Sequence, residues 1–221
     1  MKFKTFGFIC LAIIAISSCK KGVDGVTETQ TTSVNYINTT GDTLNVYANG
    51  SRINITNSIY PLGSSGYLNT PIGEQNYQVK KYGNPNVLFS LQMPLKEDNV
   101  YSFYLTGNSP DNVFTDVDTL KGVDTLTLIR FVHTSPNAGN VDVWVGDTVK
   151  FNGMAYKSTS QFMHIRPGIK RIRIYKAGCT TQLLSDETRT LIINRAYTLF
   201  TKSGLSADGG TTSGTGLVIN K

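Results

Sequence analysis

The stretch that decides the fold is residues 130–145, which read RFVHTSPNAGNVDVWV. Two strand-like runs flank a segment of Ser, Pro, Asn and Gly, residues that favour tight turns. In the second run valine alternates with Asp142 and Trp144, which is the period of a strand with one face in a core. The alternation predicts that Val143 points into the core, whereas Asp142 and Trp144 point to solvent.

Runs of this kind fill the chain from residue 33 onward. Segments rich in Val, Ile, Tyr, Phe and Thr alternate with Gly, Asn, Asp and Pro clusters at close spacing, which is typical of an all-β sandwich or barrel. We find no segment with helical periodicity. Hydrophobic residues make up 39% of the chain, an ordinary share that predicts a packed core.

The runs occur twice in the same order. The matching segments are 35–39 and 130–134, 44–48 and 141–145, 77–81 and 172–176, and 100–103 and 196–199. A self-match with a steady offset predicts two copies of one structural unit. We therefore predict two tandem immunoglobulin-like β-sandwiches, residues 33–122 and 123–221. Tyr101 and Tyr197 each stand where that fold has a corner tyrosine bonded to nearby backbone.

The second copy resembles a known family. Residues 130–138, 141–145, 167–168 and 196–198 are similar to domain-of-unknown-function family 4397, whose pattern runs roughly R-V-x-H-x-S-P-x-A, V-D-V-Y-V, P-A-G and A-Y-T. The first copy is degenerate, because residues 38–41 (NTTG) replace the His-x-Ser-Pro segment. The resemblance implies a β-sandwich that is secreted or lipid-anchored, and it implies no activity.

The start of the chain reads as a lipoprotein signal. A positive start and an apolar run over residues 6–16 precede Ile16-Ser17-Ser18-Cys19, which resembles a lipobox. The run is shorter than the roughly 20 residues that span a bilayer and is typical of a cleaved signal. We predict a signal peptide over 1–18, lipid attachment at Cys19 and a flexible tether over 19–32. The alternative is an ordinary secretory signal with Cys19 as a bystander.

These features predict a location in the cell envelope of a Gram-negative bacterium. Several acyl chains on Cys19 would make the membrane a permanent partner. Lys20 stands where an inner-membrane retention signal would have Asp, so we expect the protein at the outer membrane. The sequence predicts neither the periplasmic nor the outer side of that membrane in preference to the other.

Cysteine and charge set further bounds. Cys10 leaves with the signal and Cys19 carries lipid, so Cys179 is the one free thiol and is expected to be a half-buried structural residue.

The net charge of +6 is uneven, with twelve Lys/Arg against six Asp/Glu from Val123 onward. The basic half could meet lipopolysaccharide phosphates or an acidic glycan, it could rest against the other half, or the uneven charge could have no role.

Catalytic patterns are missing from the sequence. Of the two histidines, we expect His133 to bond turn groups, and its spacing from His164 is unlike any zinc motif. The acidic pairs at 97–98 and 186–187 are expected in solvated turns rather than as a glycosidase pair. We expect no enzyme activity, no cofactor, no metal and no nucleic-acid partner.

Four Asp-Thr-aliphatic triplets also recur, at 42–44, 118–120, 124–126 and 147–149. They are similar to an O-glycosylation sequon of one group of Gram-negative bacteria. The alternative is that Asp-Thr simply marks turn-to-strand junctions.

Outward aromatic and arginine side chains are the candidate ligand-binding residues: Tyr47, Trp144, Arg171, Arg173 and Tyr175. Aromatic faces stack on sugar rings and guanidinium groups bind carboxylates. We therefore expect a non-catalytic binding or adhesion module for a glycan or a protein. The alternatives are a structural subunit or spacer of an envelope assembly and, third, a glycan-active enzyme. An outward Trp144 beside a groove would favour the first, and a Trp144 buried at the contact between the two halves would favour the second.

Overall fold

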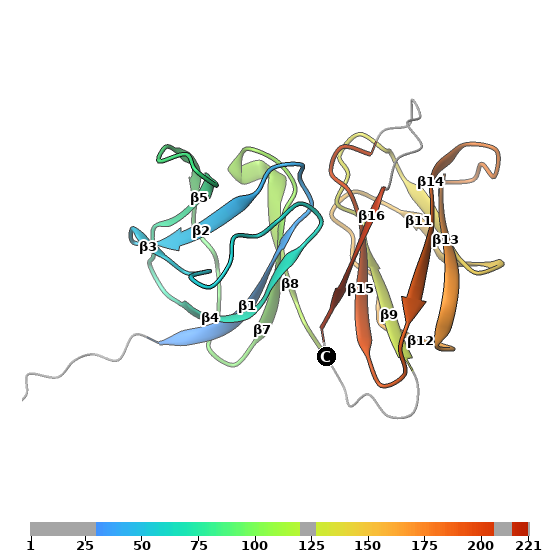
Figure 1. Ribbon diagram of the computed structural model, residues 1–221, viewed down its shortest axis with the longest axis horizontal. Helices are drawn as coiled ribbons and strands as arrows, with labels where there is room; N and C mark the ends of the chain where they lie inside the picture. Colours follow the sequence, from blue (N-terminus) through green and yellow to red (C-terminus); the bar gives the residue numbers. More distant parts are fainter. Residues whose placement is uncertain (1–29, 120–126, 206–213, 221) are drawn as a thin grey trace, which may run out of the picture.

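A computed structural model describes residues 30–119, 127–205 and 214–220, and it contains sixteen strands and one short 3-10 turn, η1 (Pro110–Asn112). The strands form two β-sandwiches that lie side by side (Figure 1). In the described residues no helix is long and apolar enough to cross a membrane. Cys19 and the expected tether up to residue 29 lie outside the described residues, as does the expected domain boundary at residues 122 and 123.

The first sandwich packs the sheet β4-β1-β7-β8 against the sheet β3-β2-β5-β6. Its strands are β1 (Thr31–Asn38), β2 (Leu44–Ala48), β3 (Ser51–Arg52), β4 (Ser64–Pro71), β5 (Tyr77–Lys81), β6 (Val87–Leu91), β7 (Val100–Leu105) and β8 (Val113–Val117).

The second sandwich packs the sheet β12-β9-β15-β16 against the sheet β11-β10-β13-β14. Its strands are β9 (Thr127–Val132), β10 (Val141–Val145), β11 (Thr148–Met154), β12 (Met163–Ile165), β13 (Gly168–Lys176), β14 (Leu183–Leu191), β15 (Ala196–Thr201) and β16 (Thr215–Ile219).

The two sandwiches have the same topology. Adding eight to each strand number of the first gives the strand order of the second, and β1 runs parallel to β7 as β9 does to β15. The prediction of tandem β-sandwiches is confirmed. Each has four strands in both sheets, whereas an immunoglobulin constant domain has sheets of four and three.

The two corner tyrosines occupy equivalent positions. The hydroxyl of Tyr101 accepts a hydrogen bond from the N–H of Lys96, and that of Tyr197 accepts one from the N–H of Ile192, both at 3.0 Å. Each donor lies five positions upstream of its tyrosine. The expected tie between hydroxyl and backbone is confirmed, and its identical offset supports the repeat independently of the strand order.

Strand alternation predicted the core residues correctly but misjudged Asp142. Val46 and Val143 are fully buried at equivalent places in the two cores. Asp142 was expected in solvent, yet it is buried, and its carboxylate accepts the N–H of Gly153 at 2.7 Å and of Gly178 at 2.8 Å. Alternation gives the direction of a side chain, and it cannot show that a neighbouring strand and turn will cover it.

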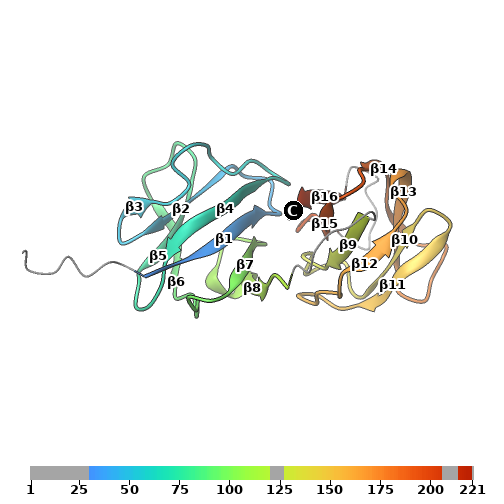
Figure 2. The same cartoon turned by 90° about the horizontal axis from the view of Figure 1, so that it is seen from below.

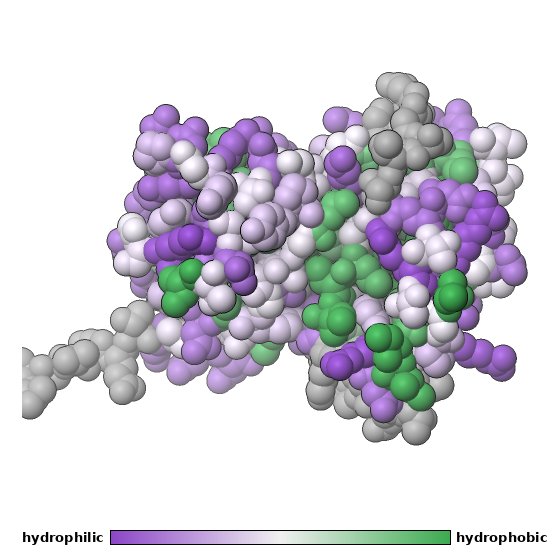
Figure 3. All heavy atoms as spheres, in the orientation of Figure 1, coloured by the Kyte–Doolittle hydropathy of each residue, from purple (hydrophilic) through white to green (hydrophobic). Residues whose placement is uncertain are grey.

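The sandwiches meet through the sheets that contain β1 and β9 (Figure 2). Ile37 and Tyr104 from the first sandwich pack with Val132, Phe200 and Val218 from the second, all of them at most 5% exposed. Figure 3 shows apolar side chains gathered along this seam, over β16. Strands β9 and β15 are therefore buried on both faces, one against their own core and the other against the partner sandwich.

Candidate functional site

The predicted binding residues of the second half lie on the sheet β11-β10-β13-β14, which is the sheet remote from the first sandwich (Figure 2). The antiparallel register of β10 and β13 places Trp144 opposite Arg173 and Asp142 opposite Tyr175. Alternation along β13 puts Arg171, Arg173 and Tyr175 on one face. The structure thus brings four of the five predicted residues onto one face of one sheet.

Trp144, Arg173 and Tyr175 form a connected cluster. The rings of Trp144 and Tyr175 meet edge to face, with centroids 6.1 Å apart and planes at 69°. The guanidinium carbon of Arg173 lies 5.4 Å from the Trp144 ring centroid, and its Nη2 donates to the carbonyl oxygen of Gly146 at 2.7 Å. A cation–π contact of this kind contributes about 0.5–1 kcal/mol at a partly exposed site. Arg173 is thereby held along the indole, and all three side chains remain partly accessible.

Arg171 lies on the same face but is already paired. Its Nε donates to Asp186 at 2.8 Å and its Nη2 bonds the second carboxylate oxygen, which lowers the pKa of Asp186. The expectation of a solvated turn at 186–187 was wrong, because both residues belong to strand β14. Glu187 bonds Arg189 and the N–H of Thr215. The other acidic pair, at 97–98, does lie in a turn.

Tyr47 occupies the place in the first sandwich that Trp144 has in the second. It lies on β2, is half-buried, and has the Nζ of Lys80 4.7 Å from its ring centroid. The structure therefore does not bring Tyr47 together with the Trp144 cluster, because the two lie on sheets of different sandwiches.

A hollow of about 410 Å³ adjoins the Trp144 cluster. It is formed by the hairpin between β10 and β11 and by the connection from β12 to β13. Its polar lining comprises Asp147, Thr148, Lys150, His164, Arg166 and Lys170. Sequence reasoning missed this hollow, because its cations come from two separate parts of the chain, β11 and residues 166–170. Only the charge excess of the second half pointed to it.

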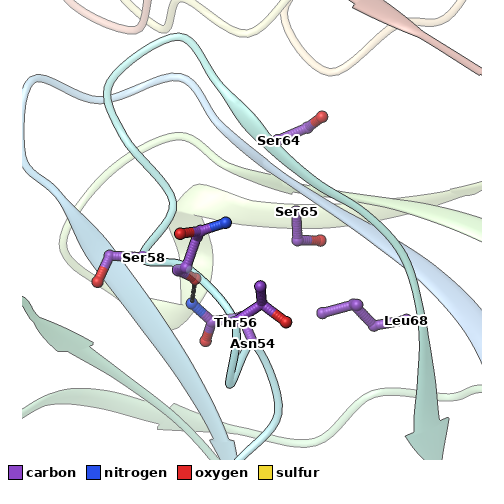
Figure 4. Close-up of a pocket in the computed structure, with 7 residues that line it drawn as sticks. Asn54, Thr56, Ser58, Ser64, Ser65 and Leu68 are labelled. Atoms are coloured by element: carbon purple, nitrogen blue, oxygen red, sulfur yellow. Dashed lines mark hydrogen bonds between the residues drawn. The ribbon is translucent and has the colours of Figure 1, made fainter.

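A second cavity lies in the first sandwich and has a neutral lining. Asn54, Ser58, Ser64, Ser65 and Leu68 are among the residues around its roughly 220 Å³ (Figure 4). The amide of Asn54 donates to Asn45 at 3.0 Å and to the carbonyl of Asn57 at 2.8 Å, and it accepts the N–H of Val46 at 2.9 Å. These bonds occupy Asn54 in bracing the loop between β3 and β4, so it is not free for a ligand.

The two histidines and Cys179 differ in burial and in their contacts. His133 is fully buried, bonds the carbonyl of Gly139 at 2.7 Å and accepts the N–H of Ser135, so its expected turn contacts are confirmed. Burial lowers the pKa of His133. His164 is exposed and Cys179 is half-buried as expected. Among the described residues no group of three His, Cys, Asp or Glu side chains could hold a metal ion.

One acidic pair does converge, at the seam between the sandwiches. Asp116 and Asp118 both bond the guanidinium of Arg130, which is 2% exposed. Arg130 also donates to Thr198 at 2.8 Å and to Ser102 at 3.2 Å. The carboxylates are thus neutralised within an interface instead of facing a cleft, which is the geometry of a structural tie. The sequence analysis assigned no role to Arg130, because strand alternation shows only that its side chain lies on the face opposite to the core residue Phe131.

Comparison with known proteins gives one family. The family model described as "Domain of unknown function (DUF4397)" matches residues 32–142 and residues 127–213. The two matches begin within β1 and at the start of β9, the equivalent first strands of the two sandwiches. No curated protein matches the chain.

Proposed function

The chain belongs to the DUF4397 family of domains of unknown function, and from that premise we propose that it is a lipid-anchored, non-catalytic module that binds a glycan at the bacterial envelope. The observation that carries the proposal is the cluster of Trp144, Arg173 and Tyr175 on the open face of the second sandwich. That face is turned away from the seam between the sandwiches, so no part of the first sandwich competes for it (Figure 2).

The chemistry of the cluster suits a sugar. Indole and phenol faces stack on the C–H faces of pyranose rings, and a guanidinium donates to hydroxyl or carboxylate oxygens. Arg173 and Tyr175 hold Trp144 before any ligand arrives, which reduces the entropy lost on binding. Strand residues position such a site more rigidly than loop residues do.

Lipid attachment at Cys19 supplies the envelope location in this proposal. The Lys20 that follows the cysteine favours the outer membrane of a Gram-negative cell. Mass spectrometry of the native N-terminus should show an acylated Cys19, and an unmodified N-terminus at another residue would disprove the anchor.

A glycan array probed with the full chain and two single variants tests the binding role. Trp144→Ala should remove most of the binding through lost stacking while leaving the fold intact. Tyr47→Ala is the matched control, because it deletes the equivalent aromatic residue of the first sandwich. Binding that survives Trp144→Ala, or that falls equally in both variants, would contradict the proposal.

The second candidate is a rigid structural spacer in an envelope assembly, and the buried seam around Arg130 favours it. A photo-crosslinking amino acid at Tyr175 separates the two roles in intact cells. A spacer that docks through this face should yield one discrete protein adduct, whereas a displayed glycan-binding face should yield none.

A further inference from the structure

Three cations converge on the hollow beside the Trp144 cluster. Lys150 comes from β11, Arg166 from the connection between β12 and β13, and Lys170 from β13. The hollow of about 410 Å³ falls within the range of roughly 300–1,000 Å³ typical of ligand pockets. Two parts of the chain, β11 and residues 166–170, thus meet around one space of ligand size.

The positive charge of the hollow is not neutralised. In the described part of the chain, Lys150, Arg166 and Lys170 form no ion pair with a carboxylate, whereas the neighbouring Arg171 is paired with Asp186. Asp147 is the one acidic residue of the lining. Its fully exposed carboxylate is paired at 3.6 Å with Arg173, which does not line the hollow, and so it does not neutralise the three cations that do. Like charges gathered in a concave surface raise the local potential and attract an anion.

The hollow borders the aromatic cluster at Gly146, at the end of the sheet. Arg173 lies over the ring of Trp144 and donates to the carbonyl of Gly146, and Gly146 itself lines the hollow. A polymer stacked on Trp144 would pass along Arg173 and around the end of the sheet at Gly146, where its next sugar residues would meet the cations of the hollow.

We propose that the ligand of this face is an anionic polysaccharide, with a sugar ring on Trp144 and a carboxylate or sulfate in the hollow of Lys150, Arg166 and Lys170. The stacking half of this inference rests on the proposed function. The anion half rests on the hollow alone, so the two can fail separately.

Affinity electrophoresis of the full chain in non-ionic detergent tests the inference with three polymers. Heparin offers sulfate, polygalacturonate offers carboxylate, and dextran is neutral. Both charged polymers should retard the chain far more than dextran does. The triple variant Lys150→Gln/Arg166→Gln/Lys170→Gln should weaken binding to them at least tenfold. The remaining affinity should depend less on salt, because exposed charges are screened within about 8 Å at physiological ionic strength.

A second triple variant, Lys96→Gln/Lys176→Gln/Lys202→Gln, is the control. It removes the same three charges from positions outside the hollow, so general attraction between a basic protein and a polyanion falls equally in both. The first triple variant should therefore bind the charged polymers more weakly than the second only if the anion site lies in the hollow. Equal losses in the two variants, or no retardation by either charged polymer, would overturn the inference.

Two further outcomes separate this inference from the proposed function. Binding to dextran that Trp144→Ala abolishes, without binding to either charged polymer, would leave the glycan role standing and remove the anion site. Heparin binding that needs the three cations and ignores Trp144→Ala would leave the anion site and remove the stacking platform. Capture by phosphatidylglycerol vesicles in place of any polymer, lost in the first triple variant, would reassign the hollow to a membrane surface and overturn the inference.

Discussion

Replacing Arg130 by methionine should loosen the seam between the two sandwiches. Methionine fills much of the same volume, so the change removes the charge and its hydrogen bonds with little cavity. Asp116 is partly exposed and can be solvated, but the side chain of Asp118 is wholly buried. The variant Arg130→Met therefore leaves an uncompensated carboxylate inside the protein.

The expected loss follows from the groups that remain around Asp118. Breaking a buried ion pair by removing one partner costs roughly 3–5 kcal/mol. Asp118 would keep hydrogen bonds from Ser102 at 2.9 Å and from Tyr67 at 2.6 Å, which places the loss at the lower end. We expect about 3 kcal/mol, or a fall in the urea midpoint of roughly 1–3 M for an m value of about 1–3 kcal/mol/M. Adding Asp118→Asn should recover part of it, because a neutral amide is cheaper to bury.

The single tryptophan makes the assay specific to one sandwich. Trp144 fluorescence reports unfolding of the second sandwich alone, whereas far-ultraviolet circular dichroism reports both. The two signals should share one midpoint in the unsubstituted chain and separate in Arg130→Met. Arg171→Met is the control, since it breaks an exposed Arg–Asp pair within one sheet and should keep the midpoints together. A loss below about 1 kcal/mol, or coincident midpoints in Arg130→Met, would refute the reasoning.

Three further outcomes can be measured by urea unfolding. Asp142→Val should lower the free energy of unfolding by about 2 kcal/mol, because two backbone N–H groups lose a charged acceptor, and Asp142→Asn should lower it by about half as much. A loss below about 0.5 kcal/mol for the valine variant would mean that water replaces the carboxylate. Gly216→Ala should cost roughly 1–3 kcal/mol, since its Cβ would meet the ring of Phe200 at 2.1 Å, whereas Gly204→Ala, with open space around it, should be near neutral; similar losses in both would contradict this. The free energy of unfolding should fall as the pH drops below about 6.5, because burial lowers the pKa of His133 below its unfolded value and the unfolded chain then binds more protons. An equally steep dependence of the unfolding free energy on pH in His133→Gln would assign the effect to other groups.

Sequence periodicity was sufficient to predict features that depend on a single strand and its own core. The repeat, the inward valines and the corner tyrosines belong to this class, because each follows from alternation or from a fixed offset along the chain. The gathering of Trp144, Arg173 and Tyr175 on one face could be predicted for the same reason, once two strands were expected to share a sheet.

The features that sequence could not give depend on surfaces meeting across the fold. An outward position on a strand can face water, a loop or another domain, and alternation is identical in the three cases. Arg130 and Asp142 are both outward residues by period, yet one lies in the seam and the other under a hairpin and a turn. The cations of the hollow come from β11 and from residues 166–170, and these two parts of the chain are brought together because β11 and β13 both pair with β10.

The seam also explains why any ligand face should be sought on the second sheet of each sandwich. Because the β1 and β9 sheets are packed against each other around Ile37, Tyr104 and Phe200, the centre of their outer faces is covered, whereas the outer faces of the β2 and β10 sheets are not part of this contact. The duplication supplied both of these with an outward aromatic residue, Tyr47 or Trp144, and both have a nearby cation. The second adds a neighbouring ring, Tyr175, and an adjoining hollow whose three cations form no ion pair among the described residues. The first copy has therefore kept the architecture that builds the seam, and the second has in addition the chemistry that could hold an extended anionic ligand.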